Sequence, residues 1–188
     1  MRRFARDRSG SVLIEVAFAL PLLLLLISGG FEIGRYALLE MKVGRAAVTL
    51  ADLVSQNDPS ISSSEIADFS QSIPYIGQPF SFSNANTEII VTGVKADETD
   101  TPKVCWQQAE MGTLGEASSV GAPGDTATLP QNLALLSADT VIVAEVFYNY
   151  EPAIFSGFIG PHTISASAVF RPRLATLDTL TPSGATCS

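Results

Sequence analysis

An apolar run close to the N-terminus, interrupted by one carboxylate, constrains this chain more than any other feature of its sequence. The run extends from Ser11 to Phe31, and Glu15 is the charged residue inside it. As a helix, these 21 residues would span roughly 31 Å, close to the ~30 Å hydrocarbon core of a bilayer. A carboxylate within a membrane span is costly unless it is paired. The sequence therefore predicts a transmembrane helix over residues 11–31 in which Glu15 has a function.

The charges that precede this run predict its orientation. Residues 1–10 contain four Arg and one Asp, and positive charge beside a first span tends to stay in the cytoplasm. We therefore expect a cytoplasmic basic leader, a single span, and a remainder on the outer side of the membrane. A removed secretory signal fits less well, because cutting at the A-x-A pattern of Ala17 and Ala19 would leave about a dozen apolar residues on the product.

Gly10 and Glu15 together predict a more specific arrangement. If the chain is cut after Gly10, Ser11 becomes a new N-terminus with an ammonium group, and Glu15 lies four residues further on the same helix face. The carboxylate can then pair with that ammonium, or with the ammonium of a neighbouring helix, where an unpaired charge would be costly. The alternative is an uncleaved anchor helix with Glu15 near the headgroups, where a carboxylate costs less than at the midplane.

Two stretches of this region resemble a known family. Residues 8–26 read RSGSVLIEVAFALPLLLLL and residues 30–36 read GFEIGRY; together they resemble the TadE/TadG-like proteins of the tight-adherence (Flp) type IV pilus system. In that family a prepilin peptidase cuts some members after the Gly of a G-x-x-x-x-E motif, and Gly10, Ser11 and Glu15 fall on its positions. One position departs from the pattern, because the residue after the Glu is often Tyr or Phe and here is Val16.

The resemblance implies a function in pilus biogenesis and surface adhesion. It implies a minor pseudopilin or a membrane-anchored assembly component, not an enzyme, in the bacterial inner membrane with its C-terminal domain in the periplasm. The implied partners are other pilins or pseudopilins, the inner-membrane pilus machinery and the prepilin peptidase. The alternative is an uncleaved inner-membrane scaffold that binds through its periplasmic domain. Weaker similarities to the same family follow at residues 47–56, 103–106, 143–152 and 170–174.

The charge of the remainder argues against anionic partners. The formal net charge is −8 at pH 7, and a chain cut after Gly10 would carry −11, because the leader contributes +3. An acidic domain of this kind is a poor binder of nucleic acid or of anionic lipid.

The two cysteines, Cys105 and Cys187, both lie on the predicted outer side. An oxidising compartment and an even count favour a disulfide. That bridge would close a loop of about 80 residues, worth about 4 kcal/mol on a chain-entropy model. The C-terminal tail has little apolar surface to bury and should be mobile unless this disulfide holds it. The alternative is two unpaired thiols.

Beyond the span, apolar residues at spacings of three and four predict that the helix continues over residues 32–56. The stripe can pack on the chain's own sheet or on a neighbouring helix, and Pro21 invites a kink or a locally melted turn in the span. Residues 57–188 have room for one periplasmic domain. The stripe consists of Tyr36, Leu39, Val43, Ala46, Leu50 and Leu53.

Residues 57–188 predict an α+β, pilin-like fold in which the long helix packs on an antiparallel sheet of about four strands. A short helix is expected from Ser62–Ser64 to Ile73, and residues 112–130 are expected to form a long surface loop. The predicted strands are residues 88–95, 103–108, 140–150 and 163–170.

No residue pattern indicates an enzyme, a metal site or a cofactor. His162 follows a turn proline and is expected to be a strand-end residue. The acidic cluster Asp97, Glu98 and Asp100 lacks the spacing of a calcium loop and is expected to be a solvated hairpin turn. Trp106 and Tyr148 are the remaining candidates for a binding platform, and we expect them to pack within the sheet.

Overall fold

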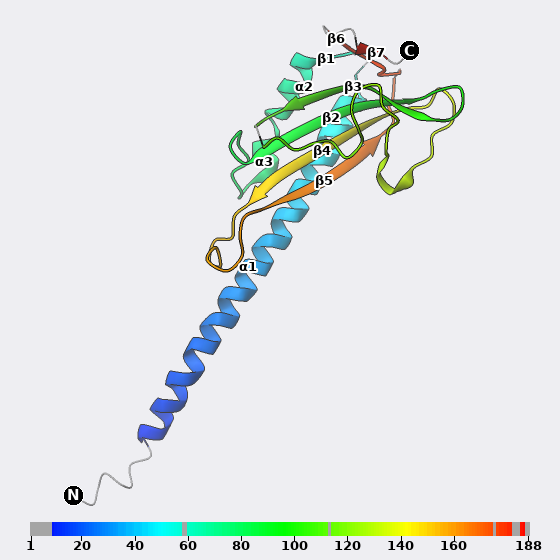
Figure 1. Ribbon diagram of the computed structural model, residues 1–188. Coiled ribbons are helices and arrows are strands. Elements are labelled where there is room, and N and C mark those ends of the chain that lie inside the picture. Colours follow the sequence, from blue (N-terminus) through cyan, green and yellow to red (C-terminus); the bar gives the residue numbers. More distant parts are fainter. Residues whose placement is uncertain (1–8, 58–59, 113, 175, 182–184, 187–188) are drawn as a thin grey trace, which may run out of the picture.

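A long helix projects from a compact α+β domain in the computed structural model of this chain (Figure 1). The structure describes residues 9–57, 60–112, 114–174, 176–181 and 185–186. The N-terminal half of the helix stands clear of the domain, whereas its C-terminal half lies along the sheet (Figure 1). This arrangement confirms the predicted α+β architecture.

Helix α1 comprises Ser9–Ser55, 47 residues in one element. Pro21 lies inside it, yet residues 9–55 are helical throughout, so the locally melted turn that the sequence invited does not form. A proline removes one backbone hydrogen bond, and the bonds of the flanking turns keep the helix continuous.

The main sheet has four antiparallel strands in the order β3-β2-β4-β5. Each predicted strand is present and extends by no more than two residues at an end. Apolar and β-branched residues fill the two central strands, which explains why β2 and β4 are buried along nearly their whole length. The strands are β2 Thr87–Ala96, β3 Pro102–Glu110, β4 Thr140–Tyr150 and β5 His162–Phe170.

The predicted stripe on α1 packs on one face of this sheet. Four of its members are fully buried, and they share a core with alternate residues of β4 such as Ile142, Ala144 and Val146. The helix therefore packs on the chain's own sheet, and that alternative of the sequence analysis is confirmed. The four are Leu39, Val43, Ala46 and Leu50.

The opposite face of the sheet is covered by irregular chain, which corrects a prediction. Residues 112–130 do not simply form a surface loop, because Val120, Ala127 and Leu129 are buried against the sheet residues Val141 and Val143. Composition rich in Gly, Ser and Thr indicated a loop, but a few apolar residues in it are enough to cover a sheet face. A 3-10 turn, η2 Pro130–Asn132, follows this segment.

The region after α1 contains two short helices where one was expected. Ser62 caps α2 (Ser63–Ser70) through a capping box with Glu65, whose amide donates to the Ser62 hydroxyl at 3.2 Å. The predicted start is therefore confirmed, but α2 ends before Pro74, and α3 (Ile73–Gly77) begins with that proline near its N-terminus.

A small second sheet, which the sequence analysis missed, joins the two ends of the domain. Its order is β1-β6-β7, with β1 parallel to β6. The C-terminal segment that leads into it has apolar side chains to bury, since Leu177 and Leu180 are 0% and 3% exposed. The expectation of a tail without buried contacts is therefore wrong for this part. The strands are β1 Ile61–Ser62, β6 Thr179–Thr181 and β7 Ala185–Thr186.

Candidate functional site

The predicted assembly motif lies at the start of α1. Gly10 is within the first turn of the helix, and Glu15 follows on the same helix with its side chain exposed. The side chain of Ser11 lies outside the described part. Cleavage at Gly10 and pairing of Glu15 therefore stay predictions.

The helix that follows Glu15 is long and apolar enough to cross a membrane. Its side chains from Val12 to Ile27 are unburied, and Phe18 exposes 80% of its surface. A stretch of this kind in water would leave a large apolar surface uncovered. The N-terminal half of α1 therefore needs a bilayer or other helices around it, because the domain does not cover it.

The first fully packed position of the described helix is Glu32, the residue immediately after the predicted span. Its carboxylate accepts hydrogen bonds from the Tyr150 hydroxyl, from the Ala153 amide at 3.1 Å and from the Ile154 amide at 2.9 Å. Glu32 is 6% exposed. These bonds hold the end of β4 and the start of the β4–β5 loop against α1, directly after the predicted span.

Three rings pack together beside Glu32. The Tyr36 ring lies 5.4 Å from Tyr150 in an edge-on arrangement and 5.7 Å from His162, and Tyr150 lies 5.4 Å from His162. Edge-to-face ring contacts add to the free energy of burial. We call this set, Glu32 with Tyr36, Tyr150 and His162, the exit joint.

The protonation state of Tyr150 suits its role in the exit joint. Burial, followed by the hydrogen bond to Glu32, raises the pKa of Tyr150 to about 12. The hydroxyl therefore stays protonated over the physiological range and remains a donor to the carboxylate. His162 is the first residue of β5, which agrees with the predicted strand-end position, but its ring contacts give it a packing role that the sequence did not indicate.

A groove of about 710 Å³ lies beside the exit joint, between α1 and the segment after α3. Phe31, Leu38 and Phe80 give it an apolar lining, and the Arg35 guanidinium lies 5.7 Å from the centre of the Phe80 ring. Such cation–π contacts are favourable where the cation is partly shielded from water. Arg35, the first basic residue after the predicted span, thus lies against the domain.

Another buried carboxylate holds the long loop to the sheet. Glu145, 3% exposed on β4, accepts hydrogen bonds from both Ser118 and Ser119. All of these donors belong to the segment that covers the sheet. Glu145 is therefore occupied in positioning that segment and is not available to a ligand.

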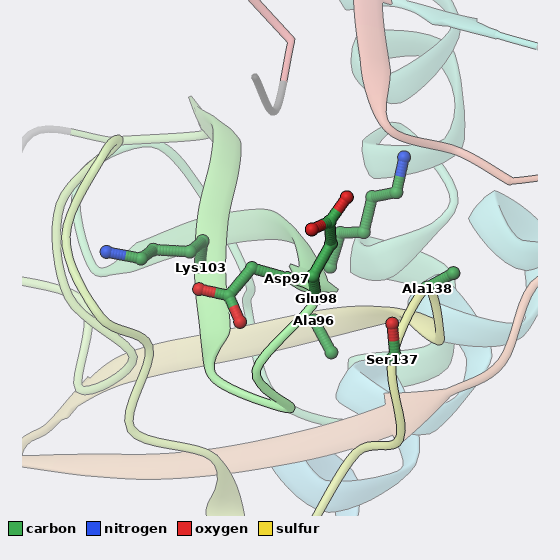
Figure 2. Close-up of a pocket in the computed structure, with 7 residues that line it drawn as sticks. Ala96, Asp97, Glu98, Lys103, Ser137 and Ala138 are labelled. Carbon is green, nitrogen blue, oxygen red and sulfur yellow. The ribbon is translucent and has the colours of Figure 1, made fainter.

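The acidic turn between β2 and β3 borders a pocket of about 350 Å³ (Figure 2). Asp97 accepts hydrogen bonds from the Thr99 amide at 2.8 Å and the Thr101 amide at 3.0 Å. Hydrogen bonds from Thr99 and Thr101 lower the pKa of the Asp97 carboxyl. Asp100 accepts a hydrogen bond from the amide of Ser137, a residue that lines the pocket. These carboxylates shape a hairpin turn, as predicted, and the described residues contain no His, Cys, Asp and Glu group arranged to hold a metal ion.

The two aromatic candidates pack within the domain, as expected. Trp106 is fully buried, and its indole donates to the Leu177 carbonyl at 3.0 Å. Tyr148 packs against Phe82, with 4.8 Å between the ring centres. Trp106 is therefore enclosed by the domain, whereas Tyr148 also borders the groove beside the exit joint.

The predicted disulfide involves a residue outside the described part of the chain. Cys105 lies in β3 and is 5% exposed, whereas Cys187 is among the residues that the structure does not describe. The bridge between them stays a prediction. The segment that leads toward Cys187 does pass β3, since the Leu177 carbonyl accepts the bond from Trp106.

The exit joint was not predicted from the sequence, although Glu32 lies in the stretch of residues 30–36 that resembles the TadE/TadG-like family. A second carboxylate directly after an apolar span, with Tyr36 one helical turn further on, was the available signal. Its partners on β4 and in the β4–β5 loop lie more than a hundred residues away in the sequence, so periodicity could not identify them.

A match to a protein family lies within α1. Residues 10–52 match the family described as TadE-like protein. The match includes Gly10, Glu15 and Glu32, and it indicates a component associated with the Tad pilus. No curated protein and no solved structure is significantly similar to the chain.

Proposed function

We propose that the chain is a minor pseudopilin or membrane-anchored assembly component of a Tad-type pilus. In this proposal residues 11–31 cross the bacterial inner membrane, residues 1–10 lie in the cytoplasm, and the α+β domain lies in the periplasm. The observation that carries the proposal is the position of Gly10 and Glu15 at the start of an uncovered apolar helix, within the segment that matches the TadE-like family.

The chemistry of assembly follows from the processing of the leader. A prepilin peptidase hydrolyses the peptide bond between Gly10 and Ser11, and Ser11 gains an ammonium group. This charge pairs with Glu15 of the same helix or of a neighbouring subunit, where the low dielectric of a helix bundle makes an unpaired charge costly. Assembly is then sensitive to whether the leader has been removed.

The first test is the intact mass of the protein extracted from membranes. In cells that contain the prepilin peptidase we expect a mature chain that begins at Ser11, and in cells without the peptidase we expect the full-length chain. Recovery of the full-length chain alone from both strains would favour the alternative function, an uncleaved scaffold that binds through its periplasmic domain.

The second test addresses Glu15 directly. The Glu15→Val variant should still insert, because it makes the span more apolar, and should still be cut at Gly10. It should fail to support surface pili, because the Ser11 ammonium loses its partner at a cost of several kcal/mol. The measurement compares cleaved protein, membrane fraction and surface pili in one strain, with the exposed-residue variant Glu40→Val as its control. Normal piliation with cleaved Glu15→Val protein would show that the carboxylate has no role in assembly.

A further inference from the structure

The β4–β5 loop, residues 151–161, presents apolar side chains at one end of the domain. Phe158 exposes 91% of its surface, and Ile154 and Ile159 each expose 48%. No charged residue lies between Glu151 and His162. Single exposed apolar residues are ordinary, but several within one short loop mark a surface that contacts something apolar.

The position of this loop indicates which apolar environment its side chains contact. The Ala153 and Ile154 amides donate to Glu32, the residue that follows the predicted span. Figure 1 shows the loop beside α1 at the end of the domain that faces the projecting half of the helix. The apolar tip of the loop therefore lies at the level where α1 would emerge from a bilayer.

The backbone of the loop is also suited to a region of low water content. The Phe158 and Ile159 amides both donate to the Phe155 carbonyl at 2.8 Å, which closes a compact turn. The Ala153 and Ile154 amides are satisfied by Glu32. Internal partners lower the cost of placing backbone amides close to the hydrocarbon of a membrane, and these four amides of the loop have them.

We propose that residues 154–159 insert their apolar side chains into the outer interfacial layer of the bilayer that α1 crosses. This inference rests on the proposed function, because it takes α1 as a membrane span. Lipid is the occupant because the loop is bonded to α1 directly after a stretch whose large apolar side chains, from Val12 to Ile27 and at Phe31, are exposed. The domain then has two attachments to the membrane, the span and the loop, which fix its orientation on the membrane surface.

The test uses tryptophan fluorescence of the full chain reconstituted in phosphatidylcholine vesicles. The native Trp106 is fully buried in the domain and supplies a constant background. Phe158→Trp places a reporter at the loop tip, and its high exposure makes the substitution harmless to the fold. We expect its emission to shift to shorter wavelength, and to lose intensity when the lipids carry bromine near the headgroup end of their acyl chains.

Two further variants separate this inference from the proposed function. Leu136→Trp is the matched control, because Leu136 is 71% exposed but precedes β4 at the opposite end of the sheet, so bromolipids should not quench it. Leu24→Trp reports on the span and should be quenched most by bromine deep in the acyl chains. Quenching at residue 24 without quenching at residue 158 would overturn the loop inference and leave the span intact.

The remaining outcomes are equally decisive. Absence of quenching at both positions would refute the membrane span as well as the loop inference. A reporter at residue 158 that is shielded from aqueous acrylamide but not quenched by bromolipids would mean that protein covers the loop, which also overturns insertion into lipid.

Discussion

Loss of the hydrogen bond between Glu32 and Tyr150 should lower the free energy of unfolding of the domain. The burial and charge of these two residues give the expected size of the loss. Tyr150 is 3% exposed, so its hydroxyl has no ready access to water once the carboxylate is removed. A hydrogen bond to a charged group contributes about 1.5–3 kcal/mol to folding. Tyr150→Phe should therefore lower the free energy of unfolding by about 2 kcal/mol.

Glu32→Ala should lower the free energy of unfolding only slightly more than Tyr150→Phe does, although it removes three hydrogen bonds. Ala153 and Ile154 are exposed residues, and water can replace the carboxylate at their amides when lipid does not prevent it. We therefore expect about 2–3 kcal/mol for Glu32→Ala. The free energy of unfolding of the double variant should be close to that of the less stable single variant. The coupling energy between the two side chains in this double-mutant cycle is then about 1.5–2 kcal/mol.

The assay is thermal unfolding of the full chain in mild detergent, followed by the fluorescence of the buried Trp106. A loss of 2 kcal/mol corresponds to a fall in Tm of roughly 4–8 °C for a domain of this size. Glu40→Ala, at an exposed position of the same helix, is the control and should stay within about 0.5 kcal/mol of the parent. If the effects of Glu32→Ala and Tyr150→Phe add to within about 0.5 kcal/mol, the two side chains do not interact and the exit joint is not the fastening that we describe.

Two further predictions concern the cysteines and a glycine of β2. In unreduced protein, Cys105 and Cys187 should both resist alkylation because they form a disulfide, and ready labelling of both thiols by iodoacetamide, measured by mass, would contradict this. Gly93→Ala should lower the free energy of unfolding by about 1–3 kcal/mol, because the new Cβ would lie 2.3 Å from Nε1 of the buried Trp106. Gly44→Ala on α1, where an added Cβ meets no atom within 4 Å, is its control and should be neutral or mildly stabilising in the same thermal assay; equal effects of the two would refute the clash.

Local sequence pattern determined the long helix and the four strands of the main sheet. The helical stripe from Leu39 to Leu50 depends on a period of 3.6 residues, and β4 depends on a run of apolar and β-branched residues; a sequence displays both directly. The span and the position of Glu15 were equally visible, because the hydrocarbon thickness of a bilayer fixes the length of an apolar helix.

Tertiary structure decided which of these elements meet. Val120 and Leu129 belong to a segment with no periodicity, and their burial depends on the apolar outer face that β4 offers to them. Burial in the C-terminal segment likewise depends on a surface that another part of the chain supplies. Leu177 is buried because the chain returns to the Trp106 side of the sheet.

The exit joint shows this division most clearly. The sequence by itself placed Glu32 at the end of an apolar span, but its spacing from Tyr150 carries no periodic signal. Their contact depends on the packing of α1 along the sheet, which brings the end of β4 to the point where the helix would leave the membrane. Local periodicity is a property of neighbouring residues, whereas a contact across the domain is the joint result of register, packing and loop length, and only the folded chain combines them.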